Sequence, residues 1–90
     1  MKLYEVGVLY IKLRAFDSAI IAFDNMLDNY YDTTYAELAH VGIIQCHSEM
    51  LEVEKAQKYL ELKKDILNVE LQTEAERYIA KAYKRIEKAK

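Results

Sequence analysis

Two histidines and the one cysteine are the side chains of this chain best suited to metal binding or catalysis. His40 and His47 lie seven residues apart, which on a helix is about two turns and places both on roughly one face. The same spacing separates the two rings by about 10 Å, too far to share one ion without ligands from elsewhere. We therefore expect no metal site, and we expect both histidines to face a groove or the solvent.

Cys46 lacks the neighbours that a thiol nucleophile requires. Such a nucleophile needs a nearby base and a third group that orients the base. His47 is the next residue, and adjacent residues on a helix do not face each other. The chain also lacks a glycine-rich phosphate loop, a Ser/His/Asp pattern and a paired-carboxylate motif. The sequence therefore predicts a non-enzymatic protein without a cofactor, in which Cys46 is a small packing residue.

The composition predicts one all-α domain. Ninety residues, of which 52% are hydrophobic and 31% charged, suffice for a single domain with a buried core. The absence of proline and the presence of only two glycines argue against a fold built from β-hairpins. No apolar run approaches the roughly 20 residues that span a bilayer, so we expect no membrane insertion by this segment.

A short motif recurs after 35 residues and contains both glycines. Leu3–Leu9 returns as Leu38–Ile44, with Gly7 and Gly42 at matching positions. A period near 35 that places a small residue inside an apolar helical pattern is typical of stacked helical hairpins. Glycine allows two helices to cross closely. We therefore expect the two glycines to face the second helix of their own hairpins, Gly7 at Ala19 and Phe23, and Gly42 at Ala56 and Leu60.

Capping residues and apolar periodicity predict five helices. Asp17 is a good N-cap, while Thr34 and Thr73 each open a capping box with a glutamate three residues later. We place a turn at 32–34, and the 35-residue repeat favours another near 50–53. The predicted helices cover about 2–14, 17–30, 34–50 and 53–67, followed by a fifth that begins at 73.

These helices are expected to form about two and a half antiparallel hairpin repeats in a right-handed stack. The repeats cover 1–33 and 34–70, and the segment 71–90 covers the open face of the second hairpin. The first helix should pack through Leu3, Val6, Gly7, Tyr10 and Leu13 or Arg14, and the third through Leu38, Val41, Gly42 and Gln45. The second and fourth helices should bury Tyr30 and Ile66 among others. The fifth should pack through Ala75, Tyr78, Ile79, Ala82, Tyr83 and Ile86.

The first hairpin resembles the tetratricopeptide repeat. The family pattern appears as Leu3–x2–Val6–Gly7–x2–Tyr10, followed by Ala19–x3–Phe23. More narrowly, residues 3–40 are similar to the BamD family, with the strings YIKLRAFDSAI, LDNYYDT and YAELA. BamD is a periplasmic lipoprotein of the machinery that assembles outer-membrane β-barrels. The resemblance therefore implies a non-enzymatic scaffold at the outer membrane, with POTRA domains of the barrel component as the partner.

A second interpretation remains open beside this one. The chain is then a more general repeat adaptor, cytoplasmic or periplasmic, that holds an extended peptide in its concave groove. First helices line the concave face of such stacks. The residues expected to contact a partner there are Tyr4, Val8, Ile11 and Lys12 of the first helix and Ile43 and His47 of the third.

Charge is divided unevenly along the chain. Residues 1–76 carry 7 basic and 14 acidic side chains, whereas residues 77–90 carry 6 basic and 1 acidic. The strongly acidic first part argues against nucleic-acid binding. The basic end is either a solvated helix end that suits the helix dipole or a docking face for an acidic partner. On the second interpretation, the contacting residues are Arg77, Lys81, Lys84 and Arg85.

Overall fold

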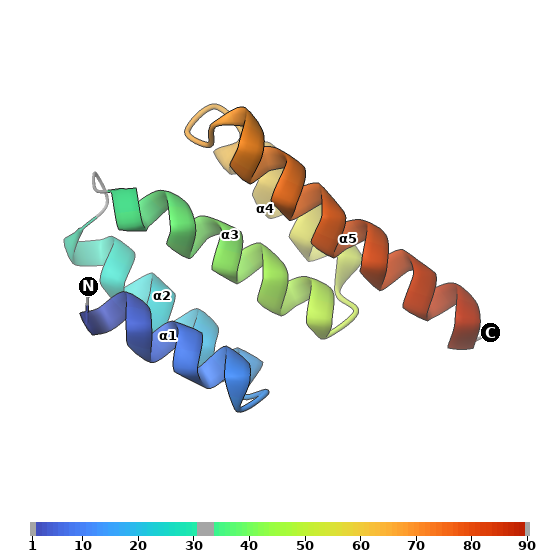
Figure 1. Ribbon diagram of the computed structural model, residues 1–90, viewed down its shortest axis with the longest axis horizontal. Helices are drawn as coiled ribbons and strands as arrows, with labels where there is room; N and C mark the ends of the chain where they lie inside the picture. The colour runs from blue at the N-terminus through green and yellow to red at the C-terminus, as the bar shows by residue number, and fades with distance from the viewer. Residues whose placement is uncertain (1, 31–33, 90) are drawn as a thin grey trace.

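The computed structural model describes residues 2–30 and 34–89, and every regular element in them is an α-helix (Figure 1). The predicted all-α class with five helices is confirmed. No helix among the described residues is long and apolar enough to cross a membrane. The helices are α1 (Lys2–Lys12), α2 (Phe16–Asn29), α3 (Thr34–Glu49), α4 (Val53–Lys63) and α5 (Val69–Ala89).

Helix α3 lies between the α1–α2 pair and the α4–α5 pair, and it contacts all four other helices (Figure 1). Two hydrophobic clusters meet on it. One joins α2 and α3 with flanking residues of α1, and the other joins α3, α4 and α5. This central position explains why α3 buries nine residues whereas α1 buries only Gly7.

The ring of Phe23 is enclosed between two helix backbones. Phe23 lies on α2 and is fully buried. A Cβ atom added to Gly7 on α1 would overlap the ring, and one added to Gly42 on α3 would lie 2.7 Å from its Cε2 atom. The expected contact between Gly7 and Phe23 is therefore confirmed. The expectation that Gly42 faces α4 is wrong, because Gly42 faces Phe23 from the opposite side.

The turns that follow α1 and α3 have the same backbone geometry. Arg14 and Leu51 both adopt left-handed conformations, with φ of 60° and 62°. The residue after each one donates its backbone N–H to the carbonyl five positions earlier, Ala15 to Tyr10 at 2.9 Å and Glu52 to His47 at 2.8 Å. These are the bonds of the Schellman motif that ends a helix. The predicted turn near 50–53 is thus confirmed.

These turns reveal a structural repeat of 37 residues rather than 35. Arg14 corresponds to Leu51, and the same shift relates Ala19 to Ala56. Two additional residues rotate a helix face by about 200°. The structural counterpart of Gly7 is consequently Ile44, which packs in one cluster with Ala56 and α5. The extra residues in α3 explain why Gly42 points to α2 and not to α4.

Three predicted helix boundaries are wrong. Helix α2 begins at Phe16 after Ala15, which makes no side-chain capping bond, so Asp17 is not the cap. Helix α5 begins four residues before Thr73, because the Oδ1 atom of Asn68 accepts the N–H of Leu71 at 2.9 Å. Helix α4 ends at Lys63. Most of the turn predicted at 32–34 lies outside the described residues.

The hydroxyl of Thr73 lies inside helix α5 and donates to the carbonyl of Val69 at 2.9 Å. A threonine that bonds one turn back within a helix cannot cap its start, so the second capping box is wrong.

The expected coverage of the second hairpin by α5 is confirmed, since Ala75, Ile79 and Ala82 are buried and α5 contacts both α3 and α4.

Other apolar positions are more exposed than predicted. The first helix packs through Tyr4, Gly7, Val8 and Ile11. Helices α2 and α3 are the neighbours of α1, and both pack against the same side of it, so its other side is open. The residues that were predicted to pack in the core but are exposed are Leu3, Val6, Leu13, Tyr30, Ile66 and Tyr83.

Replacing either glycine beside Phe23 by alanine should destabilise the fold. Helix propensity alone would make glycine to alanine favourable by about 1 kcal/mol, so the sign of the change is diagnostic. We expect Gly7→Ala and Gly42→Ala each to cost about 1–3 kcal/mol in chemical unfolding, because the added methyl group displaces the buried ring.

Combining Gly7→Ala with Phe23→Leu should recover part of that loss, since the shorter side chain makes room for the methyl group. A double-mutant cycle measures the recovery as a coupling between the two sites. A Gly7→Ala variant that is more stable than the wild type would contradict the close approach.

The left-handed turn residue Leu51 offers a test of the opposite sign. Leu51→Gly should raise the free energy of unfolding by about 0.5–1 kcal/mol, because a residue without Cβ adopts this conformation at little cost. Leu51→Ala is the matched control: it removes the same half-exposed side chain but keeps Cβ, so it should give no gain. Equal stability of the two variants in urea unfolding would contradict the turn geometry.

Candidate functional site

Helices α1, α3 and α5 together line a groove of about 300 Å³. Its floor is apolar, and the ring of Phe23 lies at its base between the two glycine positions. Polar side chains stand at intervals around it, so it offers both apolar contact and hydrogen-bonding groups. The groove is lined by Tyr4, Val8, Ile11, Lys12, Phe23, Leu38, Val41, Gly42, Gln45, Glu74 and Tyr78.

The structure brings the four predicted residues of the first helix together in this groove. Tyr4, Val8 and Ile11 are half-buried along α1, and Lys12 is exposed near the end of the same helix. Because α1 packs against α2 and α3 on one side, these side chains rest on the core and still present surface to the groove.

Two tyrosines form hydrogen-bonding points at the groove. The ring of Tyr4 packs against that of Phe23 at a tilt of 41°, with the centroids 5.9 Å apart. The hydroxyl of Tyr78 donates to Glu74 at 3.2 Å. Burial and, after it, the negative charge of Glu74 raise the pKa of both Tyr4 and Tyr78. Both phenols therefore remain protonated donors at neutral pH.

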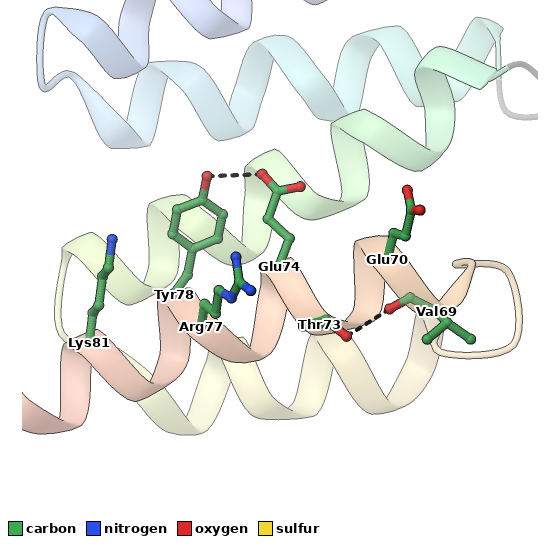
Figure 2. A pocket seen from close by; sticks show the side chains of 7 residues that line it. All are labelled: Val69, Glu70, Thr73, Glu74, Arg77, Tyr78 and Lys81. Carbon is green, nitrogen blue, oxygen red and sulfur yellow. Dashed lines mark hydrogen bonds between the residues drawn. The ribbon is translucent and has the colours of Figure 1, made fainter.

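A second, larger depression of about 490 Å³ continues from the groove along α5. It shares Glu74 and Tyr78 with the groove and extends past Arg77 to Lys81 (Figure 2). Figure 2 shows Glu74, Tyr78 and Lys81 projecting from the same side of α5. Two of the four predicted basic residues, Arg77 and Lys81, thus lie next to the groove and not within it.

The other two basic residues lie in different surroundings. Lys84 is exposed on α5 and lines neither depression. Arg85 donates to Glu49 on α3 at 3.3 Å, and Arg14 approaches the same carboxylate oxygen at 3.6 Å. Glu49 therefore links α5 to the turn after α1. Arg85 is paired within the chain and is not part of an open docking face.

Ile43 and His47 do not reach the groove. Ile43 is 1% exposed and packs in the core against α2. His47 lies on another side of α3, where its Nδ1 atom is 3.2 Å from Glu52. The expectation that Ile43 is available to a partner is wrong, because it follows the 35-residue echo. The 37-residue register relates Tyr4 to Val41 and Val8 to Gln45, and both of these residues do line the groove.

The remaining lining residues are ones that the sequence assigned elsewhere. Leu38, Val41 and Gln45 were expected in the packing stripe of the third helix, and Tyr78 in that of the fifth. Only the joint placement of three helices reveals that these residues border an opening. Glu74 carried no sequence signal, because it follows an apparent cap residue that the structure places inside α5.

His40 is buried, contrary to the expectation of a groove or surface position. It is 6% exposed, and its Nδ1 atom lies 2.8 Å from the hydroxyl of Tyr59 on α4. Burial and, after it, the positive charge of Lys63 lower the pKa of His40 to about 4. His40 is therefore a neutral residue that joins α3 to α4.

Cys46 has the packing role that the sequence predicted. It is fully buried, and burial raises its pKa to about 12, so the thiol stays protonated. No three His, Cys, Asp or Glu side chains within residues 2–30 and 34–89 are grouped closely enough to hold a metal ion.

Comparisons with protein-family models, with curated proteins and with solved structures find no match to this chain. The features of this chain that bear on its function are therefore the groove and the charges around it.

Acidification should destabilise the fold through His40. Its pKa is about 4 when folded and about 6.5 when unfolded, so the unfolded chain binds more protons between these values. Neutral His40 contributes roughly 3 kcal/mol to the free energy of unfolding. This contribution is complete above pH 6.5 and is lost as the pH falls toward 4.

The variant His40→Gln should lose this part of the pH dependence, because an amide does not titrate. Urea unfolding of both proteins at pH 7 and pH 4.5 measures the difference. Equal losses of stability in the two proteins would contradict the role of His40.

Proposed function

We propose that this chain is a non-enzymatic protein-interaction scaffold that holds a segment of a partner protein in the groove between α1, α3 and α5. The observation that carries the proposal is the groove itself, an apolar floor from three helices with polar groups along it. Peptide segments are recognised by this combination, because pockets take side chains while donors and acceptors orient the backbone.

The size and chemistry of the groove support a peptide over a small molecule. Its volume of about 300 Å³ is at the lower limit for small-molecule sites, which range over about 300–1,000 Å³. The half-buried Val8 and Ile11 offer contacts for apolar side chains. Gln45 can both donate and accept hydrogen bonds, and the hydroxyl oxygen of Tyr78, whose hydrogen is donated to Glu74, can accept one, which suits a peptide backbone.

The finer fold is part of the same proposal. We infer tetratricopeptide-like hairpin repeats, about two and a half in number and stacked with a right-handed sense. The matched left-handed turns at Arg14 and Leu51 support a repeated hairpin. The packing of α5 against both α3 and α4 supports its role as a terminal cap.

A selection from a random peptide library tests the proposed groove. Peptides selected on the wild-type chain should perturb the amide resonances of Tyr4, Val8 and Gln45 in NMR titrations. Their affinity should fall about 5- to 30-fold in Val8→Gln, since an apolar contact of about 1–2 kcal/mol is lost.

Ile21→Gln is the matched control for this experiment. Ile21 is an exposed apolar residue on α2, away from the groove, so its replacement should leave the peptide affinity unchanged. Resonance changes confined to surfaces other than the groove would contradict the proposal, as would a library that yields no binders.

A more specific candidate comes from the resemblance to BamD. The chain is then an outer-membrane-associated periplasmic component that binds a folded POTRA domain, with a cytoplasmic adaptor as the alternative location. The observation in its favour is that Arg77, Lys81 and Lys84 are exposed and form no ion pair among the described residues. Titration with POTRA domains at low and high salt should show slower association for the Lys81→Glu/Lys84→Glu variant.

A further inference from the structure

A basic strip runs along the outer face of α5. Arg77, Lys81, Lys84 and Lys88 follow one another at intervals of four, three and four residues, so they share one side of the helix. All four are exposed, and none forms an ion pair among the described residues. The strip is therefore a line of positive charge that the rest of the described chain does not neutralise.

An acidic strip with the same spacing runs along the outer face of α2. Asp17, Ile21, Asp24 and Asp28 also follow at intervals of four, three and four residues, and all are exposed. The three aspartates make no ion pair within the described residues. Partial burial and then the charge of Asp28 raise the pKa of Asp24, whereas the charge of His47 lowers it by a smaller amount.

One copy of the chain cannot bring the two strips together. Helices α2 and α5 lie on different sides of α3 and make no contact with each other (Figure 1). Both strips face away from the core, since the buried residues of α2 and α5 lie on the opposite sides of their helices. Each strip therefore remains open to another molecule.

The geometry points to a second copy of this chain as the occupant of each strip, with α5 of one copy lying against α2 of the next. In an antiparallel alignment the spacing places Arg77 opposite Asp28, Lys81 opposite Asp24 and Lys88 opposite Asp17. The fourth pair sets the methylene stem of Lys84 over the exposed side chain of Ile21. The chain itself carries the matching strip, which favours a second copy over a foreign acidic domain.

The interface is head-to-tail because it joins two different surfaces. Such contacts extend into open chains or close into rings, so association should continue beyond a dimer as the concentration rises. The interface is also electrostatic and exposed to solvent, so it should weaken steeply with salt. It requires no partner protein, and its test is therefore independent of the proposed groove function.

Sedimentation equilibrium of the whole chain measures this association. We expect the average mass to exceed that of the monomer at about 0.01 M salt, where charges act over about 30 Å, and to fall to the monomer near 1 M, where they act over about 3 Å. A wild-type chain that is monomeric at low salt throughout the concentration range overturns the proposal and leaves the basic strip free for an acidic partner domain.

Two charge-reversal variants make the test specific. Lys81→Glu/Lys84→Glu removes the net positive charge of the α5 strip, and Asp24→Lys/Asp28→Lys makes the α2 strip net positive. Each variant alone should associate less than the wild type, and an equimolar mixture should recover association, because the intact α2 strip of the first variant can meet the intact α5 strip of the second. A mixture that stays monomeric overturns the pairing of α5 with α2.

Lys58→Glu/Lys64→Glu is the matched control, because it makes the same change in net charge at exposed positions outside both strips. It should associate as the wild type does, and a loss of association in this control overturns the assignment to the strips. The variants Lys81→Gln/Lys84→Gln and Asp24→Asn/Asp28→Asn replace the reversals if circular dichroism shows that a reversal disturbs the helices, and each should reduce association.

Discussion

The packing of one aromatic ring against two helix backbones governs the arrangement of this protein. Phe23 occupies the space that Cβ atoms would fill on Gly7 and Gly42, so α1 and α3 both approach α2 closely. Large side chains at either glycine would separate the helices, and the groove beside the ring would lose its base. The ring therefore contributes to stability and to the shape of the candidate binding site at the same time.

Two left-handed turns determine which residues face that site. Because Arg14 and Leu51 end α1 and α3 in the same way, the second helix of each hairpin starts from an equivalent point. Helix α3 reaches its turn after two additional residues, and this rotates its faces by about 200° relative to the glycine echo. Val41 and Gln45 consequently line the groove, while Ile43 and Cys46 pack in the core.

The polar groups divide into internal links and external charge. The contact of His40 with Tyr59 joins α3 to α4. The ion pair of Glu49 with Arg85 joins α3 to α5. The aspartates of α2 and the basic residues at the carboxyl-terminal half of α5 are directed outward instead. Surface ion pairs contribute little to folding, at most about 1 kcal/mol each, so unpaired outward charges of this kind affect association more than stability.

Local sequence patterns were enough to predict the class of fold, the number of helices and the close approach of Gly7 to Phe23. These follow from local propensity and from the 3.6-residue period, which act over a few turns of one chain segment. The same patterns also placed Tyr4, Val8, Ile11 and Lys12 on one side of the first helix. Helix ends such as Asn68 were missed because several polar residues compete as caps, and the competition is decided by packing.

The rotation of α3, and with it the positions of Ile43, His40 and Gly42, depends on tertiary packing. The 35-residue echo concerns residue types, whereas the direction of a side chain depends on how many residues separate it from the turn that anchors its hairpin. The groove likewise requires side chains from α1, α3 and α5 that no local pattern relates. Its lining is a property of how three helices meet around Phe23, because burial depends on neighbours that are distant in sequence.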